Sequence, residues 1–393
     1  MMKQSLRILL ALIILMALMT SIMTPASARE GGVKLADDAS SAILIERDTG
    51  KIMFEKNSNE KLPPASMTKI MTMLLIMEAI DNGKITLDEK VRTSERAASM
   101  GGSQIFLEPG EEMTVDEMLK GIAIASGNDA SVAMAEHLAG SEDEFVNMMN
   151  DKAKELGLKD TNFVNSNGLP VADHYTTAHD MAMMSRELLK YESITDYTSL
   201  YEDYLRADSD KKFWLVNTNK LVKFYPGVDG LKTGFTREAK YCLTATANKK
   251  DMRVIAVVMG ASTPKDRNRQ VTEMLDYAYS QYQVHKQYDR GTVIAQVKVN
   301  KGAKNKVDAV TAENVSMLTK KGESLEGATE EVVWNEDVKA PLKEGQTVGT
   351  LKVKLDEKVL SEVSLVLSED VDEASLWQFI KRTASIMGGK RES

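Results

Sequence analysis

The sequence has few of the residues from which metal sites and disulfide frameworks are built. Its 393 residues include one cysteine, Cys242, and four histidines, with no Cys-x-x-Cys or His-Glu-x-x-His pattern. One cysteine cannot form an internal disulfide, and without clustered thiol or imidazole ligands a structural zinc site is excluded. Cys242 lies in a strand-like segment and is expected to be a buried structural thiol. We therefore predict no metal and no cofactor.

Basic blocks and long apolar stretches are also missing. The 50 lysine and arginine residues are outnumbered by 58 aspartate and glutamate residues, which gives a net charge of -8. The sequence has no block of basic residues that could bind along a phosphate backbone, so nucleic acid is excluded as a partner. Apolar residues make up 43% and charged residues 27% of the chain, close to ordinary globular usage. Disordered, collagen-like and polytopic membrane proteins are thereby disfavoured.

The N-terminus has the pattern of a secretory signal peptide. A basic start at Lys3 and Arg7 is followed by an apolar run of 12 residues (8–19) and by the small-residue triplet 26–28. The run is shorter than the ~20 residues that span a bilayer, and the triplet offers a cleavage site after Ala28. We expect residues 1–28 to be removed on export; an uncleaved N-terminal anchor is the alternative.

The C-terminus has the pattern of an amphipathic helix. Over residues 376–387, Trp377, Phe379 and other apolar residues share one half of a helical wheel, and Lys381 and Arg382 lie on the other. Such a helix suits the plane of a membrane interface and is too short and too charged to cross it. We expect residues 371–393 to attach the protein peripherally to the outer face of the cytoplasmic membrane. A helix packed on the body of the protein is the alternative.

Between the ends, the sequence predicts two bodies of different fold class. In residues 29–285, strand patterns at 41–47 and 51–55, joined by a hairpin signal, return at 241–247 and 254–260. Segments with helical spacing lie between and after them, at 66–79, 114–125, 130–139, 141–156, 177–191 and 266–283. Strands at both ends predict one sheet built from distant parts of the chain, in an α/β (α+β) unit.

Residues 286–370 change to alternating apolar and polar positions. Strand-like segments lie at 293–299, 332–334, 346–355 and 358–367, with charged and glycine-containing turns between them. Period-2 alternation without helical spacing predicts a small all-β domain. We find no catalytic grouping in it.

The first candidate for chemistry is the Ser-x-x-Lys motif 66–69. The same pattern occurs at 58–61, 209–212 and 262–265, but only Ser66 opens a long helical segment. One helical turn places the Lys69 amine beside the Ser66 hydroxyl, at the helix end that favours developing negative charge. A lysine can act as a base near neutral pH when burial and neighbouring cations disfavour its charged form. A serine N-cap with a solvated lysine is the alternative.

Two further motifs could supply the proton relay and the substrate-binding groups that accompany such a base. Ser126-Gly127-Asn128 lies between two helical segments, where Ser126 can relay a proton and Asn128 can hold a substrate amide. Lys232-Thr233-Gly234 offers a cation and a hydroxyl to a carboxylate, and its glycine lets a substrate lie along a strand edge. Alone, each motif is typical of a helix cap or a turn. Together and in this order, the three motifs form the set of penicillin-recognising serine acyl enzymes.

The chain resembles the low-molecular-mass penicillin-binding proteins, serine-type D-alanyl-D-alanine carboxypeptidases of peptidase family S11. The resemblance extends over nearly the whole length and is carried by the segments 63–69, 124–130, 163–170 and 227–236. The family also has a signal peptide, a β-rich second domain and an amphipathic C-terminal tail. The resemblance implies a β-lactamase/transpeptidase-like catalytic domain, with no metal and no cofactor.

The resemblance also implies roles for individual residues. Ser66 would be the acyl-ester nucleophile, Lys69 the proton acceptor and Ser126 the proton relay. The implied substrate-binding residues are Asn128, Lys232, Thr233, Gly234 and Phe235, with the backbone N–H groups of Ser66 and Phe235 as the oxyanion hole. The implied partners are peptidoglycan stem peptides ending in D-Ala-D-Ala, and β-lactams as covalent inhibitors. A role in cell wall maturation follows.

The sequence departs from the pattern of some relatives in two places. The middle motif is Ser-Gly-Asn, and the arginine that some relatives have shortly before Lys-Thr-Gly is missing; Lys220 or Lys223 is expected to take its place. A β-lactamase is one alternative, but no Glu-x-x-Leu-Asn segment that could supply its extra glutamate occurs. A transpeptidase, which differs only in the acceptor, and a non-catalytic penicillin sensor are the others.

Overall fold

The computed structural model describes residues 33–378. The predicted signal peptide (1–28) and residues 379–393 of the predicted anchor lie outside the described residues. Within residues 33–378, no helix is both long and apolar enough to cross a membrane.

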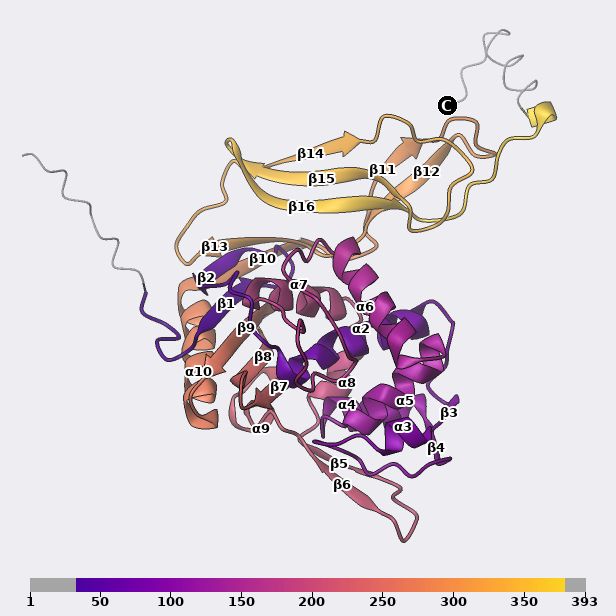
Figure 1. The fold of residues 1–393 in the computed structure, drawn as a ribbon. Helices are drawn as coiled ribbons and strands as arrows, with labels where there is room; N and C mark the ends of the chain where they lie inside the picture. Colours follow the sequence, from indigo (N-terminus) through magenta and orange to yellow (C-terminus); the bar gives the residue numbers. More distant parts are fainter. Residues whose placement is uncertain (1–32, 379–393) are drawn as a thin grey trace, which may run out of the picture. The chain divides into compact units, whose positions relative to one another are not determined.

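A five-stranded antiparallel sheet forms the centre of the first body (Figure 1). Its strand order is β2-β1-β9-β8-β7, with β1 at Ser41–Glu46, β2 at Ile52–Lys56, β7 at Val228–Thr236, β8 at Lys240–Lys249 and β9 at Met252–Ala261. Strands from the two ends of this body therefore pair directly, as β1 does with β9. This confirms the prediction of one sheet built from distant parts of the chain.

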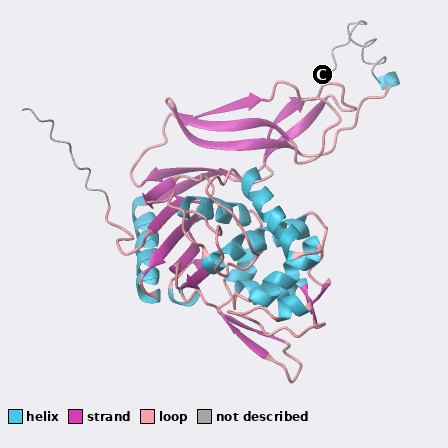
Figure 2. Ribbon diagram, in the orientation of Figure 1, coloured by secondary structure: helices cyan, strands magenta, loops and turns pink. Residues whose placement is uncertain are grey.

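Helices cover both faces of this sheet (Figure 2). One face packs against α10 (Pro264–Gln281), and α7 (Ala178–Leu188) contacts β9 and β1 on the other. The other long helices are α2 (Lys69–Asp81), α4 (Val115–Ala123), α5 (Asn128–Ala139) and α6 (Glu142–Glu155). All follow predicted helical segments. Nearly every residue of α2 is buried, as expected for a helix that is apolar on all sides and lies inside a domain.

Short elements connect these helices and strands. They are η1 (Ala65–Thr68), β3 (Lys90–Arg92), α3 (Glu95–Ala98), β4 (Glu112–Thr114), α8 (Ile194–Thr198), β5 (Glu202–Leu205), β6 (Phe213–Val216) and α9 (Leu221–Phe224). The predicted helix 66–79 is thus two elements, a 3-10 turn that contains Ser66 and then α2. The hairpin β5–β6 extends away from the sheet (Figure 1).

The second body is all-β, as predicted. Its main sheet has the order β11-β12-β16-β15-β14, with β11 at Val293–Lys298, β12 at Lys306–Thr311, β14 at Thr329–Trp334, β15 at Thr347–Leu355 and β16 at Lys358–Leu367. A separate antiparallel pair is formed by β10 (Tyr282–Tyr288) and β13 (Val315–Lys320). The core consists mainly of valine, leucine and alanine side chains, most of them from the inner positions of the strands.

Candidate active site

Ser66 lies on a short turn that side-chain hydrogen bonds hold in place. The Thr68 hydroxyl donates to the Ala65 carbonyl (2.9 Å) and contacts His174 Nε2 at 2.8 Å. His174 Nδ1 accepts the Val164 N–H, and burial lowers the pKa of His174 to about 4. The ring is therefore neutral and its Nε2 hydrogen faces Thr68. Ser66 itself caps no helix, so the alternative of a serine N-cap is wrong.

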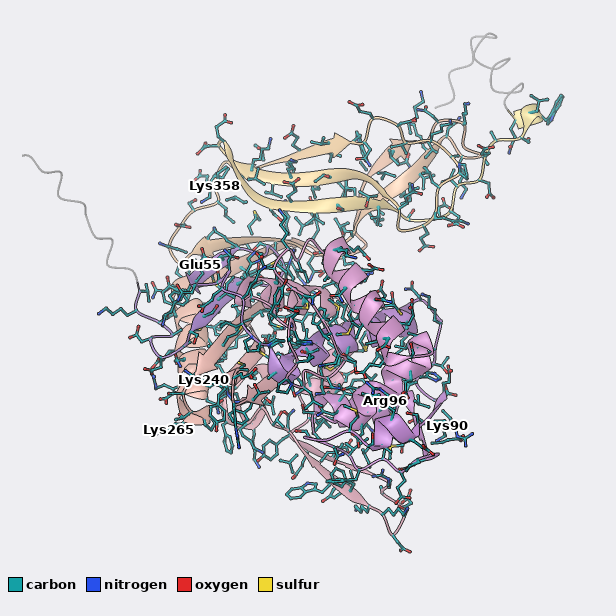
Figure 3. All side chains as sticks on the ribbon, in the orientation of Figure 1. Glu55, Lys90, Arg96, Lys240, Lys265 and Lys358 are labelled. Carbon is teal, nitrogen blue, oxygen red and sulfur yellow. The ribbon has the colours of Figure 1, made fainter. Side chains whose placement is uncertain are left out.

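Lys69 is buried directly behind Ser66. Most lysines of the chain lie at the surface, as Lys90 and Lys240 do in Figure 3, but Lys69 is 0% exposed. Its Nζ lies 3.3 Å from Ser66 Oγ and donates to Asn128 Oδ1 (2.6 Å). The alternative of a solvated lysine is therefore wrong.

The surroundings of Lys69 disfavour its charged form. Burial, and then the charge of Lys232, lower the pKa of Lys69 well below its ordinary value; Asp129 acts in the opposite direction. Nζ also donates to the Asn167 carbonyl at 2.7 Å. These two hydrogen bonds hold the amine beside Ser66, where its lowered pKa makes it suited to accept the Ser66 proton.

Ser126 and Asn128 stand at the start of α5, in two different environments. Ser126 has a φ of 66° and is 3% exposed, and its hydroxyl has no hydrogen-bond partner within the part of the chain that the structure describes. A buried hydroxyl without a partner is free to bond to a ligand. Asn128, by contrast, uses Oδ1 for Lys69 and donates from Nδ2 to the Gly101 carbonyl at 2.7 Å. Both polar groups of this side chain are thus engaged within the protein, and Oδ1 holds the Lys69 amine in place.

The Lys-Thr-Gly motif lies on β7, the edge strand of the sheet. Lys232 is 1% exposed; burial and then the Arg267 charge lower its pKa to about 7. The Thr233 hydroxyl donates to Thr218 Oγ1 at 2.7 Å. At Gly234, an added Cβ would lie 2.7 Å from the Pro64 carbonyl oxygen, so a glycine lets the turn that carries Ser66 approach the strand.

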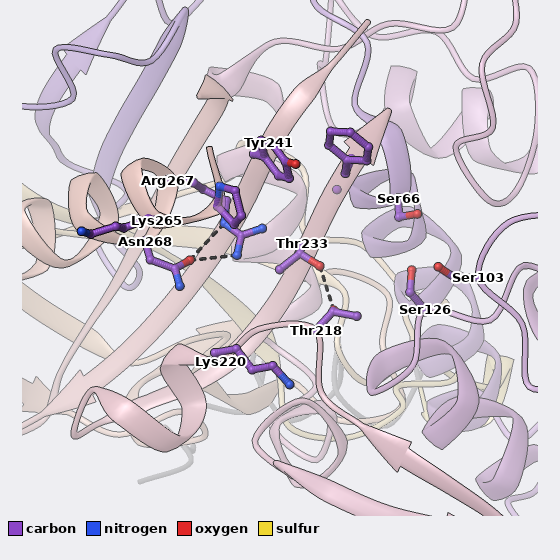
Figure 4. A pocket seen from close by; sticks show the side chains of 13 residues that line it. Ser66, Ser103, Ser126, Thr218, Lys220, Thr233, Tyr241, Lys265, Arg267 and Asn268 are labelled. Carbon is purple, nitrogen blue, oxygen red and sulfur yellow. Dashed lines mark hydrogen bonds between the residues drawn. The ribbon is translucent and has the colours of Figure 1, made fainter. Parts of the chain in front are cut away.

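These residues meet at an open cavity of about 690 Å³ (Figure 4). Its lining comprises Ser66, Ser103, Ser126, Thr218, Lys220, Thr233, Gly234, Phe235, Tyr241, Pro264, Lys265, Arg267 and Asn268. In Figure 4 the three serines face one side of this space, and Arg267 with Asn268 the other. Of the predicted site residues, Ser66, Ser126, Thr233, Gly234 and Phe235 line the cavity. Lys69, Asn128 and Lys232 are not among the lining residues and are buried.

Arg267 was not predicted from the sequence. This arginine is 6% exposed, and its guanidinium donates from Nε and Nη2 to Asn268 Oδ1 at 3.0 and 2.8 Å. It shares the buried face of α10 with apolar residues such as Val271 and Met274. An arginine on the apolar face of a predicted helix is the signal that could have revealed it. Lys220 also lines the cavity, whereas Lys223 is not among the lining residues and lies over the Tyr201 ring.

Within the described residues, no group of three or more histidine, cysteine, aspartate or glutamate side chains could hold a metal ion. A serine next to a buried lysine, an unpartnered second serine and a Lys-Thr-Gly strand at one cavity define the class of penicillin-recognising serine acyl enzymes.

Comparison with known proteins agrees with this class, and the chain belongs to the D-alanyl-D-alanine carboxypeptidase family, peptidase S11. The model of that family matches residues 27–263, and that of the penicillin-binding protein 5 C-terminal domain matches residues 282–373. Over 350 residues the chain is 64% identical to D-alanyl-D-alanine carboxypeptidase DacF of Bacillus subtilis, covering 89% of this chain and 90% of that protein. The family and the fold class expected from the sequence are thereby confirmed.

Two solved structures show the same fold. Penicillin-binding protein 5 of Haemophilus influenzae has a TM-score of 0.67 at 29% identity, covering 86% of this chain and 98% of that one. Penicillin-binding protein D2 of Listeria monocytogenes, in an ampicillin-bound form, has a TM-score of 0.56 at 30% identity, covering 62% of this chain and 98% of that one.

Proposed function

We propose that this protein is a serine-type carboxypeptidase that removes the terminal D-alanine from peptidoglycan stem pentapeptides. The observation that carries the proposal is the contact between Lys69 and Ser66: a buried lysine with a strongly lowered pKa, 3.3 Å from a serine hydroxyl in an open cavity. The name of the Bacillus subtilis relative and the ampicillin-bound Listeria structure support both the substrate and the binding of β-lactams.

In the proposed mechanism, neutral Lys69 accepts the Ser66 proton while Oγ attacks the carbonyl of the penultimate D-alanine. Backbone N–H groups of Ser66 and Phe235 stabilise the oxyanion that forms. The proton passes through the unpartnered Ser126 hydroxyl to the leaving amine, and the C–N bond breaks. Water then attacks the acyl-enzyme, Ser66 recovers its proton, and the shortened peptide leaves. A β-lactam acylates the same oxygen and is released slowly.

The terminal carboxylate of the substrate is assigned to the opposite wall of the cavity. Thr233 offers a hydroxyl there, Arg267 contributes a guanidinium, and Lys232 adds a second cation close behind. In this proposal Arg267 takes the role expected from the sequence for Lys220 or Lys223. A planar guanidinium suits a carboxylate better than a flexible lysine does, because two parallel N–H groups can bond to both oxygens.

The test of this function uses a chain without residues 1–28 and its Ser66→Ala variant. Each is incubated with a fluorescent penicillin and, separately, with a peptide ending in Lys-D-Ala-D-Ala, and covalent label and free D-alanine are measured. We expect both signals in the parent and neither in the variant, with the label mapping to the peptide that contains Ser66. Label without D-alanine would indicate a transpeptidase or a sensor, and rapid penicillin turnover without stable label a β-lactamase.

The proposed location is the outer face of the cytoplasmic membrane. In this proposal, residues 1–28 direct export, 29–285 form the catalytic domain, 286–370 the β-rich domain and 371–393 the anchor. The first two residues of the predicted helix 376–387 support it, since Leu376 is 78% and Trp377 74% exposed. We expect a chain ending at residue 370 to appear in the soluble fraction after cell lysis; unchanged membrane association would contradict the anchor.

A further inference from the structure

The hairpin β5–β6, which ends two residues before the cavity-lining Thr218, presents two aromatic side chains to solvent. Tyr204 and Trp214 are directly opposite each other in the strand register and therefore share one face. Tyr204 is 46% and Trp214 is 55% exposed, whereas Leu205 and Leu215, the next residues on each strand, are buried. We propose that this outer face binds the polysaccharide strand of peptidoglycan to which the stem peptide is attached. The inference rests on the proposed function.

The hairpin is held rigidly, so the exposure of its aromatic pair is not that of a loose loop. The Arg206 guanidinium bonds to both oxygens of Glu111, at 2.6 and 2.9 Å, and to the Ile105 carbonyl at 3.1 Å. On the other strand, the Phe213 ring meets the Phe106 ring edge to face, with centroids 5.6 Å apart. These contacts fix the inner side of the hairpin to the segment that precedes β4. On the outer side, Lys212 Nζ lies over the Tyr204 ring, and the Trp214 ring has no ring or cation contact among the described residues.

The hairpin also leads directly into the cavity wall. Thr218 follows β6 by two residues, lines the cavity and receives the hydrogen bond of Thr233. Trp214 stands four positions before Thr218 and the strand ends at Val216, so the two residues lie at most about 13 Å apart at ~3.3 Å per residue. In a stem pentapeptide, four residues likewise separate the scissile carbonyl from the sugar, about 13–14 Å when extended. The aromatic pair is therefore no farther from this wall than an extended stem peptide can reach.

The chemistry of the outer face fits a polysaccharide better than other partners. Sugar rings have apolar C–H faces and polar edges, and tryptophan and tyrosine combine an apolar ring with a polar edge in the same way. Lys212, whose Nζ lies 4.1 Å from the Tyr204 ring centroid, adds a donor for hydroxyl or amide oxygens. Charges of both signs flank the pair, which does not favour a polyanion. Two rings are also too few for a stable protein interface, which buries about 800 Å² on each partner.

The experiment compares two substrates that differ only in the sugar. One is the free stem pentapeptide, and the other is a soluble glycan strand carrying the same pentapeptide. The Tyr204→Ala/Trp214→Ala double variant is expected to keep the parent kcat/KM on the free peptide. On the glycan-linked peptide we expect about tenfold lower kcat/KM, through KM, as for loss of an aromatic anchor. Trp334→Ala, which removes a tryptophan that is 36% exposed on β14, is the matched control and should change neither value.

Three outcomes would overturn the proposal. Parent-like values on both substrates would show that the aromatic face does not bind the glycan. An equal loss on both would show that the hairpin only supports the cavity wall. A loss of self-association in sedimentation, without a glycan effect, would assign the face to a second copy of the chain. If the parent itself releases no D-alanine, the proposed function is wrong. Glycan binding can then still be tested, by comparing how much of the parent and of the double variant co-sediments with insoluble peptidoglycan.

Discussion

The Lys69→Met variant is expected to be acylated by penicillin about a thousandfold more slowly than the parent, a typical loss for a general base. Methionine has nearly the length of lysine, so it fills the same buried space without the amine that lies 3.3 Å from Ser66 Oγ. The nucleophile, the cavity and the residues assigned to the carboxylate remain. The rate of covalent labelling by a fluorescent penicillin at saturating concentration measures the effect.

A matched control separates the base from the structure around it. Thr72 lies on the next turn of α2, and its hydroxyl donates to the Ser166 carbonyl at 2.6 Å, next to the Asn167 carbonyl that Lys69 contacts. Thr72→Val removes this bond and should keep most of the acylation rate, with a lower free energy of unfolding. Comparable losses of acylation in both variants would mean that the 165–168 loop, not the amine, accounts for the effect.

The pH dependence gives a second readout for Lys69. A lysine acts as a base only when neutral, so the parent's acylation rate should fall as pH falls through the Lys69 pKa. Because burial and Lys232 place this pKa well below the ordinary 10.5, the fall should lie at correspondingly lower pH. Lys69→Met should show no such fall from this group. A variant that retains the parent's rate and pH profile would assign the base to another residue.

The catalytic centre could be predicted largely from local patterns. A serine and a lysine one helical turn apart, a Ser-Gly-Asn between helices and a Lys-Thr-Gly before a strand are each visible within a few residues. That the three motifs meet at one cavity could be predicted only from their order in the chain, because no single motif fixes a tertiary contact. Asn128 illustrates the limit: its position was predicted, but its hydrogen bond to Lys69 follows from packing over 59 residues of separation.

Features that depend on tertiary packing alone were not predicted. Arg267 lines the cavity only because α10 packs against β8 and β9, which the helical pattern of 266–283 does not indicate. Strand β13 was missed because five of its six residues are buried, so it lacks the alternation of a half-exposed strand. Val315 and Met317 belong to the apolar core of the β-rich domain, and between them Ser316 donates to Asp48 Oδ2 in the β1–β2 turn at 3.0 Å.

A glycine beside the nucleophile is expected to contribute strongly to the stability of the fold. Gly168 has a φ of 86°, and an added Cβ would lie 1.9 Å from the Ala65 carbonyl oxygen, next to Ser66 in the chain. Gly168→Ala is expected to lower the free energy of unfolding by more than about 3 kcal/mol, the sum of left-handed strain and a backbone clash. Gly157, with a φ of 71° and nothing within 4 Å of an added Cβ, provides the matched control.

Gly157→Ala carries the backbone strain without the clash, so its expected cost is only about 1–2 kcal/mol. Urea unfolding of both variants measures the difference, which isolates the clash with Ala65. Folded Gly168→Ala protein should also acylate slowly, because relieving the clash displaces either the turn of Ser66 or the neighbouring Asn167 carbonyl, 2.7 Å from Lys69 Nζ. Equal losses of stability in the two variants would contradict the close approach of residue 168 to the turn that carries the nucleophile.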